Sequence, residues 1–507
     1  MSPSPPPINA SEWQDPWWRL NHLYWILDRD GKPVLFRPNA EQERFYRSIW
    51  YRNDILKARQ LGFSTLMAIL ALDQAMWVPN YAAGLIDITM PDAVKKMRKV
   101  EFAYKRLPQI VRQACPVENM AATEWKFANG STIYCGVSAR GGTLNLLHVS
   151  ELGKIAARFP QKAREIITGA FESVSKDGLI VVESTAEGAA GPFFEITNEA
   201  HKRELERTAP TQLDFRLHFY PWYTSKEYTL DSAGQVIPEP LRKYFRELQA
   251  KEGITLTDGQ MAWYAAKKRT LKGDMKREYP STVAEAFEAH IEGAIYAEQM
   301  LDLRERGRIT SVPIDKGARV NTFWDLGAND MTAIWFHQFD DLRHRFPRYQ
   351  QANNKGLRAW WMELEEWRKE HGLMWGRHYL PHDADHAMLG EDITTKATIL
   401  RELGMTNIEI VPRISSMRAG YEVTRDEMVR DVWIDKDGCA EGIKCLDAYQ
   451  FVWSEARGVF TDEPLHNWAS HGADAFRQWA QSADKVRGSS TGPSIHKLKA
   501  RDRRRQL

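Results

Sequence analysis

Residues 55–65 read Ile-Leu-Lys-Ala-Arg-Gln-Leu-Gly-Phe-Ser-Thr and join an apolar, strand-like segment to a basic loop that contains a glycine. An apolar segment with helical character, residues 66–77, follows the loop. Backbone amides in such a loop and the N-terminus of the following helix together form a site for an anion such as phosphate. An ordinary basic turn ahead of a helix is the alternative interpretation.

The lysine of this loop is displaced. A standard phosphate loop reads Gly-Lys-Ser/Thr, but here Phe63 occupies the lysine position. Lys57 stands earlier, where the predicted strand ends. We expect Lys57 to reach back across the loop to the phosphates, and Ser64 or Thr65 to offer a hydroxyl to Mg²⁺. Arg59 adds a planar cation to the same loop and is a candidate for stabilising charge.

Two further apolar segments end in polar residues. Residues 144–151 end in Ser150-Glu151, and a nucleotide hydrolase places such a strand beside the first, with a Mg²⁺-ordering group and a water-orienting glutamate at its tip. Glu151 fits the second role, whereas Ser150 stands where aspartate is usual. Residues 179–188 end in Glu-Ser-Thr-Ala-Glu-Gly, where Thr185 is expected to help sense the γ-phosphate.

Three aspartates form a second constellation. Asp325 lies on the first strand of a predicted hairpin, Asp383 ends an apolar stretch, and Asp474 lies near a helix start. If the fold gathers them, they form a two-metal site, with ions about 3.5–4 Å apart, that clamps a phosphodiester. Carboxylate oxygens suit Mg²⁺ or Mn²⁺. Three neighbours in sequence are expected around that site: Asp330, Asp385 and His471.

These motifs together resemble those of the large terminase subunit of tailed bacteriophages, the motor that packages DNA into the procapsid. The resemblance covers most of residues 35–485 and is carried by Lys57–Thr65, Val149–Glu151, Glu183–Gly188, Asp325–Gly327, Pro381–Asp383 and His471–Asp474. It implies an α/β chain with an N-terminal P-loop (ASCE-like) ATPase, built on a parallel sheet with a small helical lid. A C-terminal RNase H-like α/β nuclease would follow. Phe63 and Ser150 are the two departures from the pattern.

The resemblance also implies roles for individual residues. Glu151 would orient the attacking water, and Arg59 and Arg140 would stabilise charge within the chain or across a subunit ring. An arginine exposed in a loop is the alternative for Arg140. Gln42 would bind adenine through its amide, although an exposed helical glutamine is commonplace. The phosphates and Mg²⁺ would contact Lys57, Arg59, Gln60, Gly62, Ser64, Thr65, Ser150 and Thr185, and the nuclease metals would contact Asp325, Asp383 and Asp474.

The function implied by the resemblance is ATP-driven translocation of viral double-stranded DNA into the procapsid and metal-dependent endonucleolytic cleavage of the concatemer. The expected cofactors are ATP and Mg²⁺, with Mn²⁺ as a substitute in the nuclease. The expected partners are double-stranded DNA, the portal protein, the small terminase subunit and further copies of the chain in a ring on the portal, in the host cytoplasm. The alternatives are an ATP-independent DDE/D-type recombinase or resolvase, and a non-catalytic DNA-binding scaffold.

Length and composition limit the number of domains and the classes of protein to which the chain can belong. At 507 residues the chain is too long for one core, so two or three domains are expected. The net charge is only +2, which does not by itself indicate a nucleic-acid binder. Four cysteines without a Cys-x-x-Cys pair fit free thiols in a reducing compartment. The sequence shows no signal peptide and no apolar run long enough to span a membrane.

Alternation of strand-like and helix-like segments up to about residue 215 favours a parallel sheet with helices on both faces. Glu124 to Val137 reads as a hairpin turned at Asn129-Gly130. Trp222, Tyr244 and Trp263 are expected to anchor the lid. The predicted divisions are an N-terminal extension (1–34), the ATPase core (35–215), the lid (216–305), a hinge (306–318), the nuclease (319–488) and a basic, disordered tail (489–507).

Overall fold

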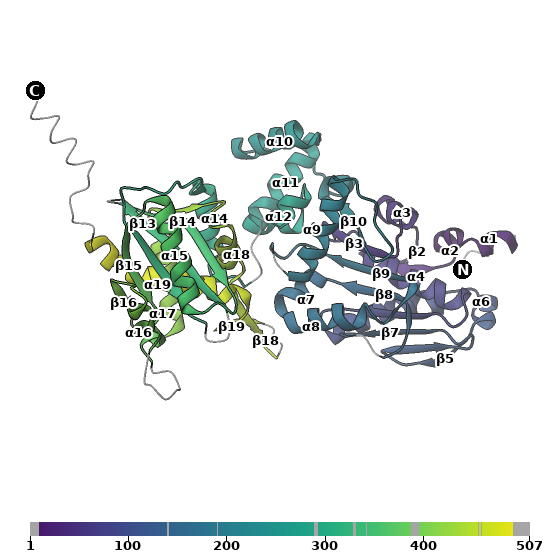
Figure 1. The fold of residues 1–507 in the computed structure, drawn as a ribbon. Helices are drawn as coiled ribbons and strands as arrows, with labels where there is room; N and C mark the ends of the chain where they lie inside the picture. Colours follow the sequence, from purple (N-terminus) through teal and green to yellow (C-terminus); the bar gives the residue numbers. More distant parts are fainter. Residues whose placement is uncertain are drawn as a thin grey trace, which may run out of the picture. The chain divides into compact units, whose positions relative to one another are not determined.

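Two compact units, residues 1–290 and 291–507, make up the chain in this computed structural model (Figure 1). The structure describes residues 10–138, 141–189, 191–287, 293–327, 331–340, 342–386, 395–454, 456–457 and 459–489. Arg140, Asp330 and nearly all of the predicted tail lie outside the described residues. In the described part, no helix combines the length and the apolarity needed to cross a membrane.

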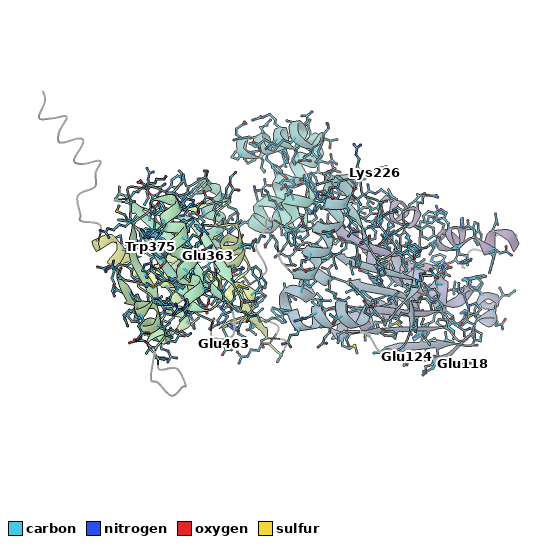
Figure 2. All side chains as sticks on the ribbon, viewed as in Figure 1. Glu118, Glu124, Lys226, Glu363, Trp375 and Glu463 are labelled. Atoms are coloured by element: carbon cyan, nitrogen blue, oxygen red, sulfur yellow. The ribbon has the colours of Figure 1, made fainter. Side chains whose placement is uncertain are left out.

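The first unit is built on an eight-stranded sheet in the order β10-β3-β9-β8-β4-β7-β6-β5. Strands from β10 to β7 are parallel to their neighbours, and the last two pairs are antiparallel. Figure 2 shows Glu118 and Glu124 at the antiparallel end. The bounds are β3 Arg52–Lys57, β4 Ala82–Ile86, β5 Val117–Met120, β6 Glu124–Phe127, β7 Thr132–Gly136, β8 Leu144–Ser150, β9 Val174–Ser184 and β10 Phe215–Tyr220.

This sheet confirms the predicted parallel α/β class and the hairpin at Asn129-Gly130, which joins β6 to β7. One expectation is wrong. The strand that ends in Ser150 does not lie beside the strand that ends in Lys57, because β9 is inserted between them. Strand order depends on long-range pairing, which the local sequence pattern does not encode. The insertion brings the carboxyl end of β9 between the two predicted catalytic strands.

Helices cover both faces of this sheet. Successive residues of a strand point to opposite faces, and Ile55 and Leu146 belong to the same core cluster as α4 (Phe63–Trp77) and α5 (Met90–Lys105). Leu56 and Leu147 belong to a second cluster. That cluster includes residues of α7 (Leu152–Arg158), α8 (Pro160–Glu165) and α9 (Gly191–Leu205). The phosphate-loop strand β3 is therefore buried from both sides, which fixes the loop that follows it.

The N-terminal extension is attached to α4 by a buried ion pair. It comprises α1 (Ala10–Gln14), α2 (Pro16–His22), β1 (Trp25–Leu27) and β2 (Pro33–Leu35), and α3 (Ala40–Arg47) follows. Arg19 Nε lies 2.7 Å from Asp73 Oδ1 on α4, and the Tyr24 hydroxyl donates to the same oxygen at 2.7 Å. Removal of either donor would leave a buried carboxylate undercompensated, so this extension is part of the folded unit.

The predicted lid is helical, with α10 (Glu239–Glu252), α11 (Asp258–Leu271), α12 (Met275–Glu278) and α13 (Val283–Ala286). Figure 1 shows α10, α11 and α12 gathered at the side of the sheet opposite β5. Trp222 stacks on Trp263 at 5.5 Å and Tyr244 on Tyr264 at 5.6 Å between ring centroids, which confirms the expected anchors. Residues 216–220, with which the predicted lid begins, belong to β10, a strand of the main sheet.

The second unit has a seven-stranded sheet in the order β11-β17-β14-β13-β12-β15-β16. β13 is antiparallel to both of its neighbours, β14 and β12, and the remaining pairs are parallel. An antiparallel meander flanked by parallel strands agrees with the expected RNase H-like α/β class. The bounds are β11 Ile309–Thr310, β12 Val320–Asp325, β13 Thr332–Asp340, β14 Arg343–Ala352, β15 Trp375–Leu380, β16 Ile408–Ile410 and β17 Val432–Asp435.

Helices and a hairpin complete this unit: α14 (Ala297–Glu305), α15 (Leu357–His371), α16 (Lys396–Glu402), α17 (Met417–Met428), α18 (Ala440–Ala448), α19 (Trp468–Ser489), and the strands β18 (Phe451–Ser454) and β19 (Val459–Pro464). The unit begins at residue 291, ahead of the predicted hinge at 306–318. Arg304 of α14 pairs with Asp447, and β11 pairs with β17, so residues on both sides of position 306 belong to the second unit. The finer divisions within each unit remain predictions.

Candidate active sites

The predicted phosphate loop runs from the end of β3 to the start of α4, and its backbone is left-handed at two positions. Gly62 has φ 78° and Gln60 has φ 62°. A side chain at position 62 would be strained, and its Cβ would lie 2.8 Å from Gln42 Nε2. That amide donates to the Gly62 carbonyl at 2.8 Å. Gln42, the predicted adenine ligand, therefore holds the loop, and its Oε1 caps α3 by accepting from Asn39 N at 2.9 Å.

Lys57 lies between two carboxylates. Its Nζ is 3.5 Å from Glu151 Oε1 and 3.6 Å from Glu183 Oε2, and its side chain is only 8% exposed. Burial by itself lowers the pKa of Lys57, but the charges of Glu183 and Glu151 outweigh it and hold the pKa above its ordinary value. The displaced lysine is therefore charged and placed at the junction of the loop with β8 and β9.

Glu183, at the end of β9, is the hub of this cluster. Its Oε1 accepts from Ser64 Oγ at 2.6 Å, Ser150 Oγ at 3.0 Å and His148 Nε2 at 3.1 Å. Burial raises the pKa of Glu183, but Lys57, His148 and Ser64 outweigh it and place the pKa well below its usual range. Sequence reasoning gave Glu183 no role of its own. A carboxylate directly after a buried apolar strand was the signal available.

Glu151 caps α7 in a left-handed conformation, with φ 58° and ψ 41°. Its amide donates to the Glu183 carbonyl at 2.6 Å, and Lys154 Nζ lies 3.2 Å from Glu151 Oε2. Burial raises the pKa of Glu151, but Lys57 and Lys154 more than offset this effect and lower it. The predicted water-orienting residue is thus an ionised carboxylate that projects from a turn at the tip of β8.

Of the other residues in the sequence motifs of this site, Phe63 packs in the hydrophobic core, and Thr65 and Thr185 lie near the charged cluster. Phe63 is buried, with its ring 5.8 Å from that of Phe45 and 4.8 Å from that of Tyr220, so position 63 contributes to the core. Thr65 Oγ1 accepts from Lys99 Nζ on α5 at 2.9 Å, a cation that sequence reasoning missed. Thr185 is also buried, directly after the Glu183-Ser184 end of β9.

Arg59 is held away from this cluster. Its guanidinium pairs with Glu278 of α12, its amide donates to the Glu278 carbonyl at 3.1 Å, and its own carbonyl accepts from the Tyr228 hydroxyl. The predicted charge-stabilising arginine is therefore tied to the lid in this conformation. Arg140, the other candidate, lies outside the described residues.

The second site gathers around Asp325 at the end of β12. β15, which leads to Asp383, is parallel to β12, and Trp335 Nε1 on β13 donates to the Gly472 carbonyl of α19 at 2.8 Å. His471 Nδ1 lies 2.9 Å from Asp325 Oδ2. Burial raises the pKa of Asp325, and the charges of Asp474 and Asp383 raise it further against the opposing effect of His471. Asp474 and Asp383 are thus both close enough to Asp325 to raise the pKa of its carboxyl.

Each of the other two acids has a cation of its own. Lys396 Nζ lies 3.5 Å from Asp383 Oδ2. Asp474 Oδ1 accepts from Arg477 Nη2 at 2.8 Å and from the Tyr449 hydroxyl at 3.2 Å. Over the residues that the structure describes, no three Asp, Glu, His or Cys side chains converge in a metal-binding arrangement. The oxygen donors suit Mg²⁺ or Mn²⁺, but these acids must turn from their cations to share an ion.

Solved structures of phage large terminases are similar to this chain. That of bacteriophage HK97 is 13% identical, covers 93% of this chain and 99% of its own, and has a TM-score of 0.42. That of a thermophilic bacteriophage is 13% identical, covers 85% and 94%, and has a TM-score of 0.29. The P22 nuclease domain is 14% identical, covers 34% and 86%, and has a TM-score of 0.27.

A scan against models of protein families finds no match, and neither does a search of curated proteins. Identities and TM-scores this low do not decide activity. The function of the chain is therefore inferred from its own residues.

Proposed function

We propose that this chain is an ATP-driven DNA-packaging motor with a separate metal-dependent nuclease site, the role of the large terminase subunit that its motifs resemble. The observation that supports this most strongly is the convergence of Lys57, Ser64 and Glu151 around Glu183, at the carboxyl ends of β3 and β8 with β9 between them. Transfer of a phosphoryl group to water needs a cation, a hydroxyl for the metal and a group that orients the water.

In the ATPase, the backbone amides of residues 60–65 would cradle the phosphates at the N-terminus of α4. Lys57 would neutralise the β- and γ-phosphates, and its charged state supports that role. Glu151 would orient the attacking water through its ionised carboxylate. Bound Mg²⁺ would neutralise developing phosphate charge, with Ser64 as a ligand. Thr185 would couple hydrolysis to movement, since it follows the strand that ends at this cluster.

In the nuclease, Asp325, Asp383 and Asp474 would hold Mg²⁺ or Mn²⁺. The bound ions would activate water and stabilise the leaving 3′ oxygen. His471 would keep Asp325 in place through its 2.9 Å contact. Lys396 and Arg477 would release Asp383 and Asp474 when the metal enters, because each now neutralises one of these acids. Such a site contacts phosphates and reads no bases.

Assembly belongs to the same proposal. The chain would act in the host cytoplasm as a homo-oligomeric ring on the portal protein, with the small terminase subunit as a further partner and double-stranded DNA as substrate. Arg140, or Arg59 once released from Glu278, would stabilise charge in the chain or in its neighbour. The basic segment Lys497–Arg505 would add contacts to DNA phosphates.

The test is to measure both activities on the purified full chain. We expect ATP hydrolysis that requires Mg²⁺, and cleavage of plasmid DNA in Mg²⁺ or Mn²⁺ with little sequence preference. Addition of the phage's own portal and procapsid should yield ATP-dependent protection of DNA from added nuclease. DNA cleavage without any ATP binding or hydrolysis would instead favour the recombinase or resolvase alternative, and absence of both activities would favour the scaffold.

A further inference from the structure

Position 150 lacks the group that a nucleotide hydrolase ordinarily has there. The usual residue is an aspartate whose carboxylate orders Mg²⁺ beside the phosphate-loop hydroxyl. Ser150 carries no charge, and its hydroxyl donates to Glu183 Oε1 at 3.0 Å. Ser64, the phosphate-loop hydroxyl, donates to the same oxygen at 2.6 Å. Both hydroxyls thus point to one carboxylate on a different strand.

We infer that Glu183 replaces the aspartate absent from position 150 and is the carboxylate that faces the divalent cation of the bound nucleotide. This inference rests on the proposed nucleotide hydrolysis and names a residue of that site to which no role has been given. It also explains how the chain works with Ser150 in place of aspartate.

Strand order makes the replacement possible. β9 lies between β3 and β8, and Glu183 is the register partner of Ser150 on β8. Register partners on parallel strands project from the same face of a sheet. The longer glutamate side chain on β9 therefore reaches the space next to residue 150 and the loop that follows β3. An aspartate at 150 would bring a second carboxylate close to the one already there.

The carboxylate of Glu183 is also incompletely satisfied. The side chain is fully buried, and Oε1 accepts three hydrogen bonds. Within the described residues, Oε2 is buried without a hydrogen-bond partner, and Lys57 Nζ is 3.6 Å away. A buried carboxylate oxygen in this state is costly. Ser64 and Glu183 offer the hard oxygen donors that Mg²⁺ prefers, so the residues present fit the ion.

A purely structural role is the competing explanation, in which Glu183 only ties Ser64, Ser150 and His148 together. Both explanations predict that Glu183→Gln lowers ATP turnover. They differ in the metal dependence of nucleotide binding. If Glu183 is only structural, Glu183→Gln lowers the affinity for nucleotide equally with and without metal. If Glu183 faces the cation, Glu183→Gln removes the gain in nucleotide affinity that the metal provides.

The experiment measures binding of ATPγS to the full chain by calorimetry, with Mn²⁺ and with EDTA, for the parent, Glu183→Gln and Glu151→Gln. We expect Mn²⁺ to tighten binding to the parent and to Glu151→Gln by tenfold or more. For Glu183→Gln we expect less than a threefold difference. Ser64→Ala, which removes the hydroxyl that donates to Glu183, should weaken the Mn²⁺ effect partially, and it serves if Glu183→Gln fails to fold.

The outcomes distinguish failure of the proposed function from failure of the inference about Glu183. A parent that binds no nucleotide overturns both the proposed function and this inference. A parent that binds with Mn²⁺-dependent affinity, together with a Glu183→Gln variant of unchanged Mn²⁺ dependence, overturns only the inference. Unchanged Mn²⁺ dependence in Ser64→Ala overturns the inference and also removes Ser64 as the proposed metal ligand. An equal loss with Mn²⁺ and with EDTA in Glu183→Gln assigns the residue a structural role and also overturns the inference.

Discussion

The two acidic clusters neutralise their charge in different ways. In the first unit one cation, Lys57, lies within 3.6 Å of both Glu151 and Glu183, and Lys154 pairs with Glu151 as well. In the second unit, His471 pairs with Asp325, while Lys396 and Arg477 pair separately with Asp383 and Asp474. The first arrangement is organised around a shared centre before any ligand arrives. In the second, each acid pairs with a different partner, so a bound metal ion would have to complete the proposed site.

The largest effect should come from the shared cation. Lys57→Ala should lower ATP turnover by about 100-fold or more, comparable with loss of a preorganised charge-stabilising group. Phe63 is buried in the core and offers no replacement. The variant should also unfold at a lower temperature, because a buried ion pair that loses one partner costs roughly 3–5 kcal/mol. Turnover and thermal unfolding are the two measurements.

Lys95→Ala is the matched control for this prediction. Lys95 has a side chain that is 66% exposed and pairs with Asp92 on α5. Its replacement should leave turnover within a factor of two. Normal hydrolysis by Lys57→Ala would show that the phosphate cation lies elsewhere, with Arg59 and Lys99 as the next residues to change.

The second prediction separates the two sites. Asp383→Asn should lower metal-dependent DNA cleavage by about 100-fold, since a neutral amide is a weak ligand for Mg²⁺ or Mn²⁺. ATP turnover should remain within a factor of two, because the proposed ATPase residues belong to the other unit. Glu402→Gln, an exposed position on α16, is the control. Undiminished cleavage by Asp383→Asn in both metals would remove this residue from the nuclease site.

The smallest effect concerns stability in acid. His344 Nδ1 accepts from Trp479 Nε1 at 3.1 Å and lies 3.0 Å from His337 Nε2. Burial lowers the pKa of His344 to about 4. The unfolded chain binds this proton near pH 6.5, before the folded chain does, so stability falls as the pH drops from about 6.5 towards 4. At pH 5 this loss is about 2 kcal/mol relative to pH 7.

Hydrogen exchange of β13 and β14 peptides in the full chain, corrected for intrinsic rates, measures this loss locally. His344→Gln keeps an acceptor for Trp479 but does not titrate. Its protection should change less between pH 7 and pH 5 than that of the parent, by about 2 kcal/mol. An identical pH dependence in the two proteins would show that other groups control the acid response of this sheet.

Local sequence predicted much of this architecture. Apolar runs with polar ends placed Lys57 and Glu151 at strand tips, and the structure brings them within 3.5 Å. The central role of Glu183 was not predictable, because it follows from the insertion of β9 between β3 and β8. The inclusion of residues 309–310 in the second sheet depends on long-range pairing in the same way. Ile309 pairs with Ile434, a contact between positions far apart in sequence.

The left-handed backbone at Glu151 affects which residues are favoured at this position under selection. A glutamate with φ 58° is strained by about 1–2 kcal/mol, a strain that glycine would not experience and asparagine would tolerate better. Because Lys57 would still be paired with Glu183 after the loss of Glu151, a variant library selected only for thermal stability should move away from glutamate at this position. The same library selected for ATP turnover should retain it. Selection for thermal stability and selection for ATP turnover would therefore favour different residues at position 151. The glutamate present is the residue expected from selection for turnover.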